Sequence, residues 1–155
     1  MYQDSKMIYF QLEYVPGGEL FTLLRNMAIF PIEHAKFYAS QIISILEYLH
    51  SLNIVYRDLK PENILINING YLKITDFGFA KKVRGKTYTL CGTPEYMAPE
   101  VVMNKGHSKP VDWWTLGILF YEMLVGIEPF HDENPMMVYQ KILAGKIKFP
   151  KIFNE

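Results

Sequence analysis

The densest group of charged and polar residues is an eight-residue run, Tyr-Arg-Asp-Leu-Lys-Pro-Glu-Asn, at positions 56–63. Within this run, Asp58 and Lys60 are two residues apart, so both side chains can face the same way in an extended loop. A carboxylate at such a point can orient a hydroxyl group, and an ammonium can hold a phosphoryl group during its transfer. The pair therefore indicates phosphoryl-transfer chemistry.

A predicted hairpin brings a second polar group toward the first. Ile64 to Ile68 is an apolar strand candidate, Asn69-Gly70 has the composition of a two-residue type I′ turn, and Tyr71 to Thr75 returns as a second strand. With these two residues in the turn, Asn63 is directly opposite Asp76. Opposed residues are about 4.5–5.5 Å apart. An amide oxygen and a carboxylate would then converge on a site that suits Mg²⁺ carrying phosphate.

A simpler explanation of the polar run is also open. Arg57, Asp58 and Glu62 could form an ion-pair cluster that caps a loop, because structural networks also gather charge. Taken singly, these residues do not separate the two interpretations. Considered jointly, four polar groups at hairpin-matched spacing favour the chemical site over packing alone.

Several elements must hold these groups in place. Met7 to Tyr14 is strand-like and ends at Pro16-Gly17-Gly18, after which a short helix is expected from Glu19. A long amphipathic helix ending near His50 is predicted from apolar residues at three- and four-residue steps. These apolar residues are Ala35, Tyr38, Ala39, Ile42, Ile45, Leu46 and Leu49.

Two further helices are expected in the second half of the chain. Trp113 to Val125 is apolar on every side, which predicts a central helix buried all round, with both tryptophans of the Trp113-Trp114 pair in the core. Asn134-Pro135 provides a cap and a first-turn proline, and Gly145 provides a stop, so a last helix is predicted between them.

Composition excludes several classes of function. The 155 residues contain 16 Lys plus Arg and 16 Asp plus Glu, so no overall charge favours nucleic acid or an anionic membrane surface. The apolar run from Trp113 to Val125 is too short to span a bilayer and contains Glu122. Cys91 is the single cysteine, which excludes an internal disulfide and fits a reducing compartment. We expect one compact domain in the cytoplasm or nucleus, with Cys91 serving packing.

Three motifs in a fixed order resemble those of the eukaryotic serine/threonine protein kinase family. Residues 56–63 resemble the catalytic loop, with Tyr56 where histidine is usual; Asp76-Phe77-Gly78 resembles the metal-binding motif; Ala98-Pro99-Glu100 resembles the end of the activation segment. The match covers essentially the whole chain. It is nearest to the cAMP-dependent branch of the basophilic kinases, on the strings Tyr56-Arg57-Asp58, Thr89 to Tyr96 and Asp112-Trp113-Trp114.

The resemblance implies a fold and its cofactors. The fold is mainly α with a small β-hairpin, an α+β arrangement that corresponds to the C-terminal, large lobe of the kinase fold, incomplete at both ends. Residues 1–155 would form a partial kinase domain without the small lobe and the last helices. The expected cofactors are ATP and Mg²⁺.

The resemblance also implies roles at the centre of the site. Asp58 would accept or orient the substrate hydroxyl, and Lys60 would steady the γ-phosphate. Thr93 would bridge Asp58 and Lys60, as in enzymes that phosphorylate serine and threonine. Asn63 and Asp76 would hold Mg²⁺, and Asp112 would anchor the catalytic loop.

Contacts to ATP are implied at positions around the strand-like segments. For the apolar members of this set, an ordinary core role is equally compatible with the sequence. The backbone of Glu13 and Val15 would meet adenine, Glu19 would reach the ribose, and Leu12 would be the gatekeeper. The complete set of expected ATP-binding residues is Leu12, Glu13, Val15, Glu19, Leu65 and Thr75.

Activation and substrate recognition are implied at other positions. Thr89 would carry an activating phosphate, with Arg57 and Lys81 as its partners. Acidic residues would bind arginines that precede the acceptor, and apolar residues would line a pocket after it, which predicts an Arg-Arg-x-Ser/Thr-hydrophobic preference. The substrate-binding residues are Glu19, Glu62, Glu122, Leu90, Pro94 and Met97.

The sequence lacks a G-x-G-x-x-G loop, the phosphate-covering motif of kinases. We therefore expect negligible activity from these 155 residues alone. An alternative is a non-catalytic binding module that uses the large lobe as a docking surface, although such a protein would have little reason to retain Asp58, Lys60, Asn63 and Asp76 together. The expected partners are protein substrates with basic residues before the acceptor and a cAMP-binding regulatory subunit.

Overall fold

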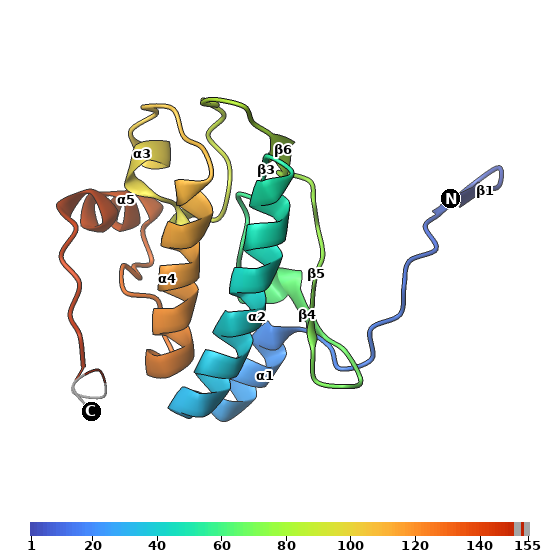
Figure 1. Cartoon of the computed structure of the whole chain (residues 1–155), viewed down its shortest axis with the longest axis horizontal. Helices are drawn as coiled ribbons and strands as arrows, with labels where there is room; N and C mark the ends of the chain where they lie inside the picture. Colours follow the sequence, from blue (N-terminus) through green and yellow to red (C-terminus); the bar gives the residue numbers. More distant parts are fainter. Residues whose placement is uncertain (151–152, 154–155) are drawn as a thin grey trace.

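A computed structural model describes residues 1–150 and 153, and helices dominate the arrangement (Figure 1). The long helix α2 (Ile32–Ser51) packs beside α4 (Pro110–Val125) at the centre of the molecule. The short α1 (Leu20–Met27) lies near the β4–β5 hairpin. α3 (Pro99–Val102) and α5 (Pro135–Ala144) contact each other on the other side of α4.

The strands form three small antiparallel pairs. The chain also contains two single-turn 3₁₀ helices. The pairs are β1 (Tyr2–Gln3) with β2 (Ile8–Tyr9), β3 (Ile54–Val55) with β6 (Lys81–Lys82), and β4 (Ile64–Ile66) with β5 (Leu72–Ile74). The 3₁₀ helices are η1 (Pro61–Asn63) and η2 (Pro94–Tyr96).

The predicted amphipathic helix is confirmed as α2, and its apolar stripe forms much of the core. Ile42 and Leu46 on α2, and Leu119 and Met123 on α4, have no exposed surface. Each fully buried side chain of this size stabilises the fold by about 1.5–3 kcal/mol relative to exposure. The central pair of helices therefore provides a rigid base for the loops that cross its ends.

The prediction that α4 is buried on every side is wrong. Trp113 is 39 % exposed, and Gly117 is also exposed on that face. Trp114 is partly buried and stacks on Phe130 at 5.9 Å between ring centroids. The two tryptophans therefore differ in burial, because the face of α4 that carries Trp113 is only partly covered by other elements. The continuous run of apolar residues does not show which face stays exposed.

The predicted hairpin exists, but its register is wrong by one residue. Ile64 pairs with Ile74 and Ile66 with Leu72, which sets Asn63 opposite Thr75 rather than Asp76. The amide of Thr75 accordingly donates to the Asn63 carbonyl at 2.9 Å. The turn contains three residues, because Asn67 and Tyr71 are hydrogen-bonded and only Gly70 has a positive φ, of 80°. A two-residue type I′ turn would need positive φ at Asn69 as well.

The sequence predicts the ends of α5 correctly but not those of β2. β2 covers only Ile8–Tyr9 of the strand expected over Met7 to Tyr14. Helix α5 begins and ends as predicted: the Asn134 side chain accepts a hydrogen bond from the Met136 amide at 3.0 Å, and Gly145 ends the helix with a φ of 65°. Within the described residues, no helix combines the length and apolarity needed to cross a bilayer.

Candidate active site

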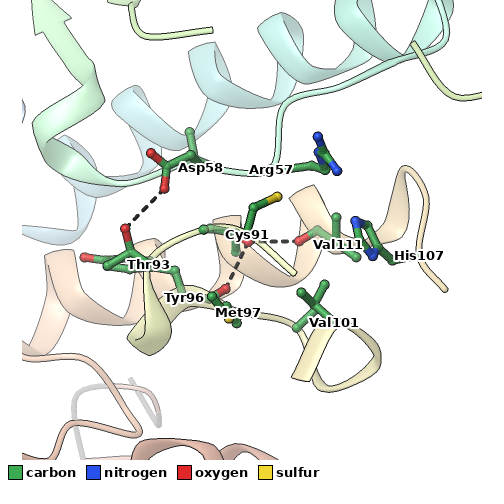
Figure 2. Close-up of a pocket in the computed structure, with 13 residues that line it drawn as sticks. Arg57, Asp58, Cys91, Thr93, Tyr96, Met97, Val101, His107 and Val111 are labelled. Atoms are coloured by element: carbon green, nitrogen blue, oxygen red, sulfur yellow. Dashed lines mark hydrogen bonds between the residues drawn. The ribbon is translucent and has the colours of Figure 1, made fainter. Parts of the chain in front are cut away.

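Asp58 lies at the centre of a buried hydrogen-bond cluster. The Thr93 hydroxyl donates to Asp58 Oδ1 at 3.1 Å, and Lys60 Nζ donates to the same hydroxyl oxygen at 3.0 Å (Figure 2 shows Asp58 facing Thr93). Lys60 Nζ is also 3.4 Å from Asp58 Oδ2, which accepts from Asn63 Nδ2 at 2.9 Å. The structure thus brings together a carboxylate, an ammonium, a hydroxyl and an amide.

The loop that carries Asp58 is held by Asp112, a residue of α4. Both oxygens of the buried Asp112 carboxylate accept backbone amides, from Tyr56 at 2.9 Å and from Arg57 at 2.8 Å. His50 Nε2 lies 2.7 Å from Asp112 Oδ2. Arg57 has a φ of 71°, a left-handed conformation that is unfavourable for a side chain of this size. The two hydrogen bonds to Asp112 stabilise this turn. They are the contacts by which Asp112 can anchor the loop, as expected from the sequence.

Tyr56 connects the loop to the segment that contains Asp76. Its ring is fully buried and lies edge-on to Phe77 at 5.4 Å, and its hydroxyl donates to the Thr75 carbonyl at 2.5 Å. Burial raises the pKa of the Tyr56 phenol, and the charges of Asp58 and Asp76 raise it further. Both carboxylates therefore lie within electrostatic reach of one buried phenol.

Asn63 and Asp76 offer the oxygens that a magnesium site needs. Because Asn63 uses its Nδ2 to bind Asp58, its Oδ1 stays available as an acceptor. Asp76 has a φ of 54°; its Oδ1 accepts from the Gly78 amide at 3.0 Å, and its side chain is exposed. Hard oxygen donors of this kind fit Mg²⁺. The described residues contain no cluster of three or more His, Cys, Asp or Glu side chains that could hold a metal ion.

Some of the residues expected to contact ATP lie in the segment before α1, and the others lie at or beside the β4–β5 hairpin. Leu12 is 81 % exposed, the exposed Glu13 forms an ion pair with Lys73, and Val15 is partly buried. Glu19 forms an antiparallel bridge with Leu65, which brings the start of α1 against β4. Thr75 lies at the end of β5, where its carbonyl binds Tyr56.

Of the residues expected around the activating phosphate, Lys81 contacts a neighbouring threonine. Lys81 Nζ donates to Thr87 Oγ1 at 3.0 Å, while Thr89 is exposed. Arg57 Nε donates to the Phe79 carbonyl at 2.7 Å. Both cations are therefore bound to neutral oxygens rather than to a charged partner.

The activation segment crosses close over the catalytic loop at Gly92. A Cβ atom at this position would lie 3.0 Å from the Arg57 carbonyl oxygen, and the φ of 110° excludes most side chains. Glycine therefore permits the approach that brings Thr93 to Asp58.

Among the expected substrate residues, Glu122 is fully buried. It accepts a hydrogen bond from the Tyr96 hydroxyl and lies 3.5 Å from Arg25 Nη2. Burial raises the pKa of Glu122 to about 7, because it outweighs the opposing effects of Tyr96 and Arg25, and the charges of Glu128 and Glu62 add to the increase. A substrate arginine would have to compete with Arg25 for this carboxylate.

The other expected substrate residues differ in exposure. Glu19 and Glu62 are exposed, Leu90 is 60 % exposed, and Pro94 begins η2. Met97 is 8 % exposed and packs against buried apolar residues that include Val55 and Val101, in a small core cluster separate from the main core. Their roles toward substrate remain predictions.

Sequence reasoning missed three residues that shape the site: His50 on Asp112, and Tyr96 and Arg25 on Glu122. His50 is 62 positions from its partner, and Arg25 is 97 positions from Glu122. No local spacing links such residues. A polar side chain on the apolar face of α2 is the one signal that could have drawn attention to His50.

Comparison with known proteins adds independent information. The protein kinase domain model matches residues 1–155. The chain is 62 % identical over 149 residues to cAMP-dependent protein kinase catalytic subunit 3 of Drosophila melanogaster, covering 96 % of this chain and 26 % of the relative. It is 60 % identical over 150 residues to the human cAMP-dependent protein kinase catalytic subunit PRKX, covering 97 % of this chain and 42 % of the relative.

A third relative gives a similar result. The chain is 59 % identical over 153 residues to the cAMP-dependent protein kinase catalytic subunit of Dictyostelium discoideum, covering 99 % of this chain and 24 % of the relative. The chain spans less than half the length of these three relatives. Since the family model matches from the first residue to the last, the chain belongs to the protein kinase family.

Proposed function

We propose that the protein to which these residues belong is a serine/threonine protein kinase that transfers the γ-phosphate of ATP to arginine-rich substrates. The observation that carries the proposal is the contact set in which Thr93 donates to Asp58 while accepting from Lys60. This arrangement leaves Asp58 poised to orient an incoming hydroxyl, and Lys60 poised to hold a phosphate oxygen.

Within this proposal, residues 1–155 correspond to the C-terminal lobe of a kinase domain. Asn63 and Asp76 would hold Mg²⁺, which supplies charge neutralisation for the triphosphate when bound. The bridge between Glu19 and Leu65 supports an adenosine site at this edge, because it brings an acidic side chain beside an apolar strand. Leu12, Glu13, Val15 and Thr75 would complete it.

Recognition of arginine in substrates rests on carboxylates that surround the cluster. Glu122 already binds a guanidinium, that of Arg25, and the charges of Glu62 and Glu128 reach the same carboxylate. This excess of negative charge supports a preference for substrates with arginines before the acceptor. A cAMP-binding regulatory subunit is the partner that the names of the relatives suggest.

The test is phosphorylation of an Arg-Arg-x-Ser-hydrophobic peptide by the full-length protein with ATP and Mg²⁺. Replacing Asp58 by asparagine should lower kcat by about 10²–10⁴-fold, the usual contribution of a positioned general base. The matched control is Glu47→Gln, which removes an exposed carboxylate on α2 and should change kcat by less than about twofold.

A wild-type protein that does not phosphorylate the peptide, or an Asp58→Asn variant as active as wild type, would contradict the proposed activity. Equal rates on the same peptide with both arginines replaced by alanine would remove the substrate preference and leave the kinase assignment intact.

A further inference from the structure

Two nitrogen atoms beside the proposed active site are buried and have no hydrogen-bond partner among the residues that the structure describes. They are Nη1 of Arg57 and Nε2 of His107. Leaving such polar atoms unpaired costs free energy, so buried nitrogens are normally satisfied by protein or by ordered water. Neighbouring polar atoms have partners: Arg57 Nε donates to the Phe79 carbonyl, and Thr115 Oγ1 lies within hydrogen-bond distance of the Val111 and Tyr96 carbonyls.

Arg57 and His107 line the same small cavity, together with Cys91 and Val111 (Figure 2). The cavity offers about 20 Å³ to the centres of water-sized molecules. Roughly 10–15 Å³ on this measure holds one water, so a single water fits and a larger ligand does not.

The position of His107 is fixed by its backbone. His107 and Thr87 exchange two backbone hydrogen bonds, of 2.8 and 2.9 Å, and the residue is 4 % exposed. The imidazole therefore reaches the cavity from the loop before α4, while the Arg57 guanidinium reaches it from the catalytic loop. No chain segment other than these two brings an unpaired nitrogen to the cavity within the described residues.

The surroundings of the imidazole, burial first among them, favour its neutral form. Burial lowers the pKa of His107, and Arg57 and Lys81 lower it further, against the opposite effects of Glu100 and Asp112. A neutral imidazole can accept a hydrogen bond at Nε2, whereas a guanidinium can only donate. The two nitrogens therefore match the two sides of a water molecule that accepts from Arg57 and donates to His107.

We propose that one buried water links Arg57 Nη1 to His107 Nε2, and that His107 is thereby a positioning residue for the Arg57 guanidinium. The functional part of this inference rests on the proposed kinase activity and on the pairing of Arg57 with phosphorylated Thr89 that the sequence predicts. Protonation of His107 would add a cation next to Arg57 and displace the guanidinium. Activity should then fall on the acid side of neutrality through a residue that touches neither substrate nor ATP.

The experiment uses full-length protein with two substitutions. His107→Gln keeps a polar atom near the position of Nε2 and does not titrate, whereas His107→Phe keeps the ring and removes the acceptor. The matched control is His34→Gln, on an exposed part of α2. The measurements are peptide turnover from pH 5.5 to 8.5, thermal unfolding, and a high-resolution crystal structure of the wild type.

We expect density for one water within hydrogen-bond distance of both nitrogens. His107→Gln should retain turnover at pH 8 within about twofold and shift the acid limb of the profile to lower pH, whereas His34→Gln should keep the wild-type profile. His107→Phe should lose about tenfold in turnover, a change of about 1.4 kcal/mol in activation free energy, and unfold at a lower temperature than His107→Gln.

Absence of the water in the wild type, or identical pH profiles for wild type and His107→Gln, would overturn the inference. If His107→Phe does not fold, the water density and the glutamine variant still decide the question. If no variant phosphorylates any peptide, the proposed function fails, while the water and the difference in unfolding temperature between the two variants still test the link.

Discussion

Asp112 and Glu122 are both fully buried carboxylates on α4, yet their surroundings differ at the scale of single residues. Asp112 accepts two backbone amides and lies against His50, so its charge is compensated by donors that cannot move away. Glu122 has Tyr96 and a half-exposed Arg25, with two other carboxylates nearby. Burial outweighs these partners, and the pKa of Glu122 rises to about 7.

This raised pKa predicts a pH dependence of stability. Between about pH 4.5 and pH 7 the folded protein retains the Glu122 proton while the unfolded chain releases it. The free energy of unfolding should therefore fall as pH rises through this window, by up to about 1.4 kcal/mol per pH unit and about 3 kcal/mol in total. Urea unfolding of wild type and Glu122→Gln at several pH values would measure the difference. A constant difference from pH 4.5 to 8 would contradict it.

Thr89 supports a second prediction at this scale. A phosphate on its exposed hydroxyl could form one to three charge-assisted hydrogen bonds with Arg57 and Lys81, which now bind neutral oxygens. Thr89→Ala in the full-length protein should lower peptide turnover at least about tenfold, since a single such bond contributes roughly 1.5–3 kcal/mol. Tyr88→Phe, one residue earlier and also exposed, is the control. Unchanged turnover in Thr89→Ala would remove the assignment.

At the scale of elements, the contact between the activation segment and the catalytic loop depends on Gly92. An alanine there would bring its Cβ to 3.0 Å from the Arg57 carbonyl at a φ that favours glycine. We expect Gly92→Ala to reduce the free energy of unfolding by about 1–3 kcal/mol and to lower turnover, because Thr93 must move from Asp58.

The matched control for this substitution is Gly85→Ala. Gly85 has open space around its Cβ position and no positive φ. An alanine there should be neutral, or stabilising by about 0.4–1 kcal/mol. Thermal and urea unfolding of both variants measure the contrast, and equal stabilities would show that the crossing tolerates a side chain.

The elements also show what the sequence can and cannot predict. Helix α5 was predictable at both ends, because Asn134 and Gly145 act through their own backbone neighbourhoods. The β4–β5 hairpin was predictable as an element but not in register, since Asn69 and Gly70 fit either a two-residue or a three-residue turn. The exposure of Trp113 depended on which partners cover α4, which local apolarity does not encode.

The same division applies to the candidate site. The convergence of Asp58 and Lys60 was predicted from their two-residue spacing, and the place of Thr93 between them from the resemblance of short strings to a family. His107 was missed because its significance comes from sharing a cavity with Arg57, a residue 50 positions away. Contacts of this kind arise only when distant elements pack together.

At the scale of the whole molecule, the described elements carry the proposed carboxylate base and the proposed magnesium ligands, but the 155 residues contain no G-x-G-x-x-G motif to cover the phosphates. We expect a polypeptide of these residues alone to phosphorylate the arginine-containing peptide at least about 10³-fold more slowly than the full-length protein, because several charge contacts to the triphosphate are needed together. Parallel assays at equal concentration test this expectation. A rate within tenfold of the full-length protein would contradict it.

The anchoring of the Tyr56-Arg57 backbone by Asp112 has a consequence for biosynthesis. The two amides and the carboxylate that binds them are separated by 56 and 55 positions, so a ribosome makes the loop well before its anchor. At about 5–20 residues per second, the delay is roughly 3–11 s. During that interval the nascent chain lacks the two amide contacts that stabilise the left-handed turn at Arg57, and these contacts can form only after the helix that carries Asp112 has emerged.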